Sequence, residues 1–120
     1  QPVPYINVYA ATKAFVLSFS RGLSREVKSR GIHVMAVCPF WTKTNFFDRA
    51  INKNDGDVIV KKYAAMYTPA NIVTKAYRDI KKKNKEVSMY GTVAKLQTFA
   101  AKIVPHKFVM SVWQKQQKLK

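Results

Sequence analysis

Two residues able to move a proton lie four positions apart near the start of the sequence, Tyr9 and Lys13, in the run Tyr-Ala-Ala-Thr-Lys. Residues at i and i+4 are neighbours on one face of a helix. A phenol, whose ordinary pKa is about 10, is a poor acid–base catalyst at neutral pH. A neighbouring ammonium stabilises the phenolate, and such a pair can pass a proton to or from a carbinol or carbonyl oxygen. The spacing alone fits equally a surface tyrosine beside a solvated lysine.

The element that must carry this pair is a helix predicted over residues 7–30. Its apolar residues recur at every fourth position: Phe15, Phe19, Leu23 and Val27. Gly31 follows, as expected just past a helix end. Residues 32–38 are then a nearly continuous apolar run that Pro39 stops, which predicts a strand buried on both faces of a parallel sheet. A helix, a glycine turn and a buried strand form an αβ unit.

After this unit the sequence signals for secondary structure are weak up to residue 67 and clearer from Thr68 onwards. Residues 40–57 are irregular, and residues 58–67 are a weak helical segment. Thr68 and Pro69 predict a helix start, with Thr as N-cap and Pro at the first helical position, and the helix is expected to reach about Lys83. Residues 86–90 are a short strand candidate.

The last 30 residues differ in character and are expected to form a separate tail, with residues 1–90 as the main α/β portion. Two amphipathic helices are predicted in residues 91–120, separated by Pro105. Residues 78–120 contain 11 Lys and Arg against Asp79 and Glu86. Basic residues beside an apolar stripe suit an anionic membrane surface, and they suit equally a packed helix with a lysine-rich outer face.

Composition limits the classes of protein and partner. The 120 residues carry 22 Lys and Arg against 6 Asp and Glu, a net charge of +16, which favours contact with anions or leaves a solvated basic surface. One cysteine, Cys38, excludes an internal disulfide and fits a reducing cytosol. No apolar stretch approaches the ~18 residues of a membrane-spanning helix. Beginning at Gln1 without Met, the sequence is interpreted as the interior of something longer.

Several motifs occur in a specific order: Tyr-Ala-Ala-Thr-Lys-Ala-Phe-Val, a long helix, Gly-Ile-His-Val, and a strand ending in Cys-Pro. Together they resemble the second half of a short-chain dehydrogenase/reductase, over residues 1 to about 90. The resemblance implies an α/β fold, the C-terminal portion of a Rossmann-like doubly wound parallel sheet, here with an amphipathic helical extension. It implies NAD or NADP as cofactor and an alcohol/carbonyl pair as substrate. By resemblance Tyr9 is the proton donor or acceptor, and Lys13 assists it and binds the nicotinamide ribose.

The same resemblance assigns residues that line the nicotinamide end of the cofactor site. The family has Pro-Gly-x-x-x-Thr after this strand, and the matching residues here are Pro39, Thr42 and Thr44. Phe40 replaces the usual Gly, so a ring lies where the family permits close backbone approach. A hydrophobic substrate is expected because aromatic residues crowd this substrate loop: Phe40, Trp41, Phe46 and Phe47.

The family's Gly-rich turn, which binds the pyrophosphate of the dinucleotide, has no counterpart in this sequence. No Gly-x-x-x-Gly-x-Gly occurs, since the glycines are Gly22, Gly31, Gly56 and Gly91. The positions of the motif Ser and of the residue that selects NAD or NADP fall before Gln1. The 120 residues alone are therefore expected to bind no dinucleotide.

The sequence is also compatible with other interpretations of its function. The chain could be a non-catalytic fragment, or a basic amphipathic module that binds membrane surfaces, and open strand edges would favour pairing with a second copy. No nucleic-acid-binding module is recognised, and no residues have metal-ligand spacing. His33 is expected to pack in the core or at the sheet edge, and Cys38 to be a structural thiol.

Overall fold

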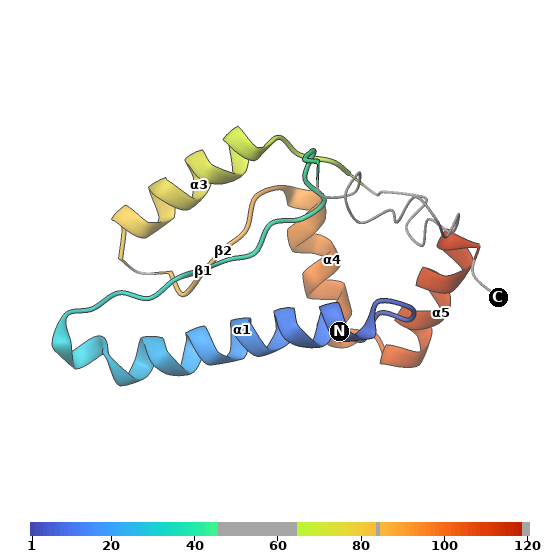
Figure 1. Cartoon of the computed structure of the whole chain (residues 1–120), viewed down its shortest axis with the longest axis horizontal. Coiled ribbons are helices and arrows are strands. Elements are labelled where there is room, and N and C mark those ends of the chain that lie inside the picture. The colour runs from blue at the N-terminus through green and yellow to red at the C-terminus, as the bar shows by residue number, and fades with distance from the viewer. Residues whose placement is uncertain (46–64, 84, 119–120) are drawn as a thin grey trace.

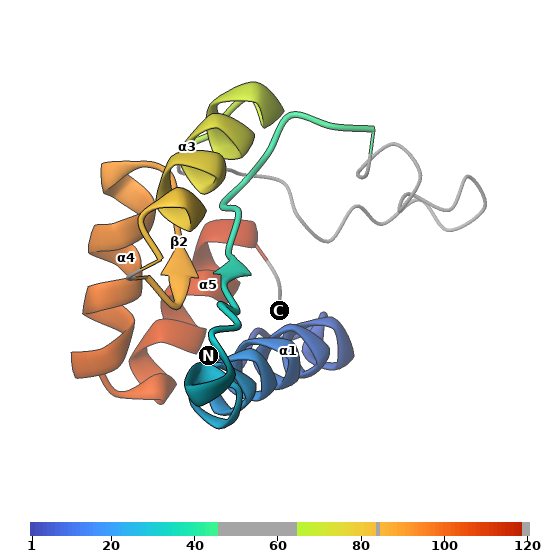
Figure 2. The same ribbon diagram turned by 90° about the vertical axis from the view of Figure 1, so that its left-hand side faces the viewer.

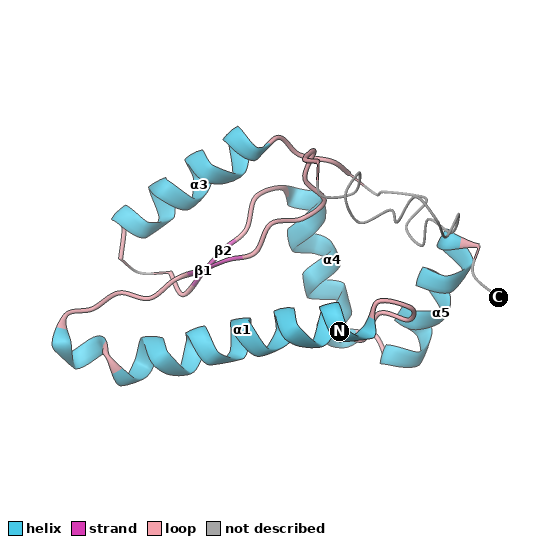
Figure 3. Cartoon of the chain, viewed as in Figure 1, coloured by secondary structure: helices cyan, strands magenta, loops and turns pink. Residues whose placement is uncertain are grey.

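The fold was analysed in a computed structural model that describes residues 1–45, 65–83 and 85–118. This part of the chain is α/β and mostly helical (Figures 1 and 3). Its elements, in order, are α1 (Asn7–Glu26), the 3₁₀ turn η1 (Lys28–Arg30), β1 (Ala36–Val37), α3 (Pro69–Lys81), β2 (Val87–Ser88), α4 (Thr92–Ile103) and α5 (His106–Gln117).

A two-stranded parallel sheet organises these elements. Ala36 is in register with Val87, and Val37 with Ser88. The ladder is flanked by two backbone hydrogen bonds of 2.9 Å each, from Ala36 N to Glu86 O and from Cys38 N to Ser88 O. Parallel strands require a crossover connection, and α3 forms part of it. Figure 2 shows α1 and α3 on opposite sides of the strands, so the sheet lies between two helical layers.

The end of α1 differs slightly from the prediction. The helix ends at Glu26, and residues 28–30 form a tighter 3₁₀ turn. Such turns commonly satisfy the last carbonyl groups of a helix. Gly31 closes the turn in the left-handed region, with φ of 71°, and its N–H donates to Lys28 O. The predicted role of Gly31 as a helix terminator is confirmed.

The prediction of a parallel strand over residues 32–38 is confirmed for Ala36–Val37 alone, and the predicted burial on both faces was wrong. The side chains of Ile32 and Val37 are 53% and 46% exposed, and the other residues of the run are partly buried. Within the described residues β1 has one neighbouring strand. The stripe on α1 is similar, because Phe15 and Phe19 stack on each other at 6.1 Å and remain exposed.

The start of α3 agrees with its prediction. The side chain of Thr68 caps the helix by accepting a hydrogen bond from Asn71 N at 3.4 Å, and Pro69 occupies the first turn. The helix ends at Lys81, two residues before the predicted end. Its buried residues are Ile72 and Asp79. A carboxylate on the inner face of an amphipathic helix requires partners, because burying an unpaired charge is costly.

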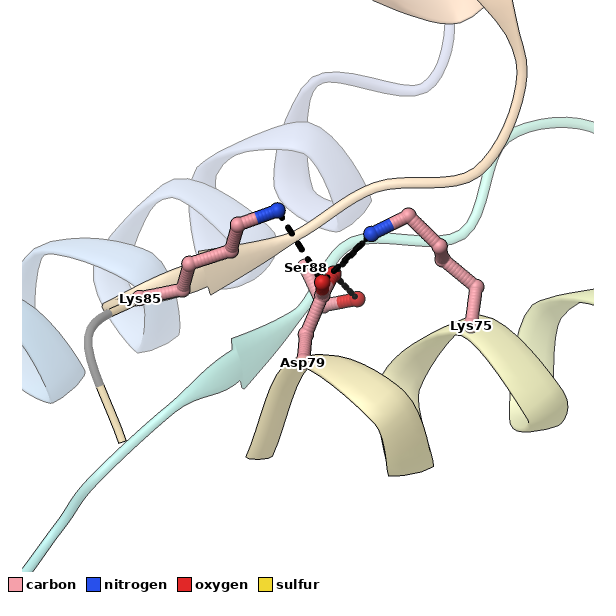
Figure 4. Close-up of polar contacts among 4 residues, drawn as sticks. All are labelled: Lys75, Asp79, Lys85 and Ser88. Carbon is pink, nitrogen blue, oxygen red and sulfur yellow. Dashed lines mark hydrogen bonds and ion pairs between the residues drawn. The ribbon is translucent and has the colours of Figure 1, made fainter. Parts of the chain in front are cut away.

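Those partners form a cluster that joins α3 to β2 (Figure 4). Asp79 is 3% exposed and accepts hydrogen bonds from the ammonium groups of Lys75 and Lys85. It also accepts one from the Ser88 hydroxyl at 2.8 Å. Hydrogen bonds from Lys75 and then Lys85 hold the pKa of Asp79 well below its ordinary value, and the Asp79 carboxylate in turn raises the pKa of Lys85. The cluster is therefore ionised at neutral pH.

A second junction forms around Tyr67, where the chain enters α3. The Tyr67 ring lies edge-on to Tyr90 at 5.2 Å and covers Gly91. Gly91 has a φ of 96° and a ψ of 140°, a region occupied almost only by glycine. A Cβ added there would lie 2.8 Å from Cε2 of Tyr67. Glycine is thus required at the start of α4 both by its backbone and by the ring above it.

The two C-terminal helices completely bury few of their residues and leave several large apolar side chains exposed. Ala94 on α4 and Gln117 on α5 are completely buried. Six large apolar side chains on these helices are exposed: Val93, Leu96, Phe99, Ile103, Phe108 and Val112. The predicted pair of helices broken at Pro105 is confirmed.

We predict that Asp79→Asn destabilises the protein at neutral pH and that its effect diminishes in acid. Because the pKa of Asp79 is lowered by folding, its contribution is complete above the ordinary carboxyl pKa of about 3.9 and is lost as the pH falls below it. Denaturant unfolding of both proteins from pH 7 to pH 3 measures this. The control is Glu86→Gln, which removes an exposed pair with Arg25 and should cost no more than about 1 kcal/mol. A constant difference across pH would contradict the prediction.

We also predict that Gly91→Ala lowers the free energy of unfolding by about 1–3 kcal/mol from backbone strain, with a further loss from the clash with Tyr67. Gly22→Ala is the matched control. Gly22 lies inside α1 with nothing within 4 Å of an added Cβ, so alanine should stabilise by roughly 0.5–1 kcal/mol. The idea fails if both substitutions shift the denaturation midpoint in the same direction.

Candidate active site

The candidate site residues lie on two different segments at one end of the layered structure. The start of α1 and the end of β1 lie at this same end (Figure 1). In parallel α/β sheets, ligands bind outside the carboxyl ends of the strands. The start of α1 carries Tyr9 and Lys13, and the segment after β1 carries Pro39, Thr42 and Thr44.

Tyr9 and Lys13 are paired as their spacing predicts. The Lys13 ammonium nitrogen lies over the Tyr9 ring, 5.4 Å from its centroid. Tyr9 is 49% exposed, so its phenol can be approached by a ligand. Thr12, between them, donates its hydroxyl hydrogen to Tyr9 O at 2.8 Å. This arrangement places a cation over the face of a phenol ring on the first turns of one helix.

The segment after β1 is held by backbone pairing. Tyr67 N donates to Trp41 O at 2.9 Å, and Lys43 N donates to Tyr67 O at 3.0 Å, around the parallel bridge between Thr42 and Tyr67. The Thr42 hydroxyl donates to Phe40 O at 2.8 Å, so it stabilises the turn while its oxygen can still accept. Pro39 and Thr44 are exposed.

Phe40, at the position predicted to crowd a cofactor, turns its ring towards other aromatic residues. Its centroid lies 6.2 Å from that of Trp41 and 6.3 Å from that of Tyr67. Phe40 and Trp41 are thus packed together as the predicted aromatic loop requires. Phe46 and Phe47, the other two residues of that loop, lie outside the described residues, as does most of the weak helix predicted over residues 58–67. Residues 65–67 are not helical.

Sequence reasoning did not identify the partners of Trp113 on α5. The indole rings of Trp41 and Trp113 stack with centroids 6.2 Å apart and planes 7° from parallel. Trp113 Nε1 also donates to Pro4 O at 3.3 Å. The only signal available in the sequence was that the chain has two tryptophans, each within an apolar or aromatic run. No local rule pairs residues separated by 72 positions.

The other candidate residues are structural or lie elsewhere. Partial burial raises the pKa of the Cys38 thiol, and Arg21 opposes this only in part, so the thiol stays protonated at neutral pH and is a weak nucleophile. His33 precedes β1 and is therefore at the opposite end of the strand from Pro39. Its Nε2 is buried and has no hydrogen-bond partner within the described residues. His106 begins α5 and is exposed.

Two further searches of the described residues gave no site. No group of three or more His, Cys, Asp or Glu side chains there could hold a metal ion. Among the helices of that same part of the chain, none is both long enough and apolar enough to cross a membrane.

Comparison with known proteins gives a partial but specific match. The family model of the short chain dehydrogenases matches residues 1–55. Over 43 residues, 36% of this chain, the sequence is 56% identical to very-long-chain 3-oxoacyl-CoA reductase of Rattus norvegicus and 54% identical to very-long-chain 3-oxoacyl-CoA reductase-B of Danio rerio. It is 50% identical over 44 residues to an uncharacterized oxidoreductase of Escherichia coli.

These matches cover 14–15% of the length of each of the three relatives. No solved structure matches the chain. The matched part contains Tyr9, Lys13 and the segment from Pro39 to Thr44, so both halves of the candidate site lie inside it. The similarity to the short chain dehydrogenase family therefore extends over residues 1–55 of the 120.

Proposed function

We propose that the protein containing this chain is an oxidoreductase that uses NAD or NADP to interconvert an alcohol and a carbonyl group. The observation that carries the proposal is the Lys13 ammonium over the Tyr9 ring, at the end of the fold where β1 ends. The match of residues 1–55 to the short chain dehydrogenase family model supports it.

The residues present fit one end of a nicotinamide cofactor. The donor set consists of the Tyr9 phenol, the Lys13 ammonium and the exposed hydroxyl-bearing residue Thr44. Lys13 would hold the ribose next to the nicotinamide, and Thr42 and Thr44, with Pro39, would line the ring. When bound, the cofactor supplies or accepts the hydride.

The chain's own residues would then donate or accept the proton. In reduction, the Tyr9 hydroxyl donates its proton to the carbonyl oxygen, which becomes the hydroxyl of the product alcohol. In oxidation the phenolate takes that proton back. Lys13 stabilises the negative charge left on Tyr9, because a cation near a phenolate favours its charged form. Both roles need only the pairing that the helix already provides.

We further propose that the substrate is a long-chain 3-oxoacyl thioester or a similarly hydrophobic ketone. The aromatic side chains of Phe40 and Trp41 beside the candidate site support an apolar substrate. The names of the rat and zebrafish relatives, very-long-chain 3-oxoacyl-CoA reductases, support this chemical class. The high positive charge of the chain would suit a substrate that carries phosphate groups.

We also propose that α4 and α5 contact an anionic membrane surface. Large apolar side chains on both helices are exposed, including Leu96 at 70% and Phe108 at 63%. From β2 to the end of the sequence there are six lysines and no Asp or Glu. Apolar burial combined with attraction to anionic lipids is how interfacial helices bind.

We expect Tyr9→Phe in the full-length protein to lower kcat/KM for carbonyl reduction by about 10²–10⁴-fold, the usual contribution of general acid catalysis. Steady-state assays with NADH and NADPH on ketones of increasing chain length measure it. Tyr5→Phe is the control, since Tyr5 is equally exposed but precedes the helix. Equal activity of the Tyr9 variant and the wild type would refute the proposed acid.

For the membrane contact, we expect Leu96→Glu to weaken co-sedimentation with anionic vesicles by about tenfold or more, since burying a leucine is worth roughly 1.5–3 kcal/mol. Val73→Glu is the control, because Val73 is 65% exposed but lies on α3. The proposal fails if the wild-type protein does not sediment with these vesicles, or if both variants weaken binding equally.

A further inference from the structure

Trp113 on α5 touches one segment of the candidate active site and the chain that leads into the other. Its ring stacks on Trp41, in the segment after β1, and its Nε1 donates to Pro4 O, in the segment before α1. We propose that Trp113 is a positioning residue that sets the cofactor-lining segment 39–44 relative to the catalytic helix α1. This inference rests on the proposed oxidoreductase function.

The segment 39–44 is held by backbone hydrogen bonds. Its hydrogen bonds to Tyr67, from Tyr67 N to Trp41 O and from Lys43 N to Tyr67 O, hold it against the chain that enters α3. These bonds fix the position of the segment's backbone beside Tyr67. They leave the orientation of the Trp41 side chain to be determined by packing.

Trp113 supplies that packing. The two indole planes are only 7° from parallel with centroids 6.2 Å apart, which is within the range of favourable offset stacking. Trp41 is directly followed by Thr42, whose hydroxyl bonds back to Phe40 O. A shift of the Trp41 ring would therefore be passed to the turn that presents Thr42 and Thr44.

The second contact of Trp113 orients it relative to α1. Pro4 lies two residues before Ile6, which flanks the first turn of α1, and Ile6 N donates to Val3 O in a turn that leads into the helix. An indole N–H at a partly buried position needs an acceptor, and Pro4 O provides it. One side chain of α5 is thus bonded to the entry of the helix that carries Tyr9 and Lys13.

The functional consequence concerns geometry. Tyr9 must act on a carbonyl group whose position is set by the cofactor, and the cofactor is lined by the segment that Trp41 belongs to. An error of about 1 Å in such an arrangement can cost about 10²-fold in rate. Trp113 need not touch the substrate to matter, because it acts through Trp41 and Pro4.

The experiment compares three variants of the full-length protein, Trp113→Ala, Trp113→Phe and Trp41→Ala, with the double variant. Phe108→Ala is the control, an exposed aromatic residue on the same helix. The readouts are kcat, KM for NADPH, the NADPH dissociation constant, and the exciton couplet of stacked tryptophans in circular dichroism difference spectra. The couplet reports the Trp41–Trp113 stack without any need for activity.

We expect Trp113→Ala to remove the couplet, to raise the KM and dissociation constant for NADPH, and to lower kcat/KM by about tenfold or more. Trp113→Phe keeps an aromatic ring but loses the bond to Pro4, so its loss should be smaller. The double variant should be no worse than Trp113→Ala alone, because the two residues act as one unit. Phe108→Ala should leave the couplet and the NADPH dissociation constant unchanged.

Three results would overturn the role of Trp113: no couplet in the wild-type protein, wild-type kinetics and NADPH affinity in a folded Trp113→Ala, or an equal loss in Phe108→Ala. If Trp113→Ala does not fold, wild-type kinetics in Trp113→Phe and Trp41→Ala would overturn it. A wild-type protein that shows the couplet but neither binds nor uses NADH or NADPH would overturn the proposed function instead, and the inference with it.

Discussion

The arrangement of the helices in this structure depends on a parallel sheet of two residue pairs. Ala36 and Val37 pair with Val87 and Ser88, and this contact brings together segments separated by about 50 residues. Because the strands run in the same direction, both continue to the same end of the sheet, where the segments after them lie together. The helices α1 and α3 cover the two sides, and the Asp79 cluster ties α3 to Ser88. So short a ladder needs these side-chain links, because its own hydrogen bonds are few.

Features that depend on neighbours in sequence were predictable. The Tyr9–Lys13 pairing follows from helical spacing, the end of η1 from Gly31, the start of α3 from Thr68 and Pro69, and the break between α4 and α5 from Pro105. Each of these is decided by backbone geometry within four or five residues. The α/β class followed because helical and strand patterns alternate along the chain.

Features that depend on distant partners were not predictable in the same way. The pattern of residues 32–38 shows a preference for burial, but exposure of Ile32 and Val37 depends on which elements lie beside them. Asp79 entered the sequence analysis only as part of the net charge, although Lys75, Lys85 and Ser88 surround it. The stacking of Trp41 on Trp113 has no local signature either. In each case the deciding contact joins different elements, so composition and periodicity could suggest the residue but not its partner.

The bond from Trp113 to Pro4 spans 109 positions of the sequence, which bears on the order of folding. Closing so long a loop is entropically costly, and contacts of this kind slow folding and follow the formation of local structure. The helices and the capped turns can form from nearby residues alone. We therefore expect α5 to dock after β1, α3 and β2 have assembled, so that one of the last steps of folding completes the candidate site. We also expect α5 to be one of the first elements to detach when the protein begins to unfold.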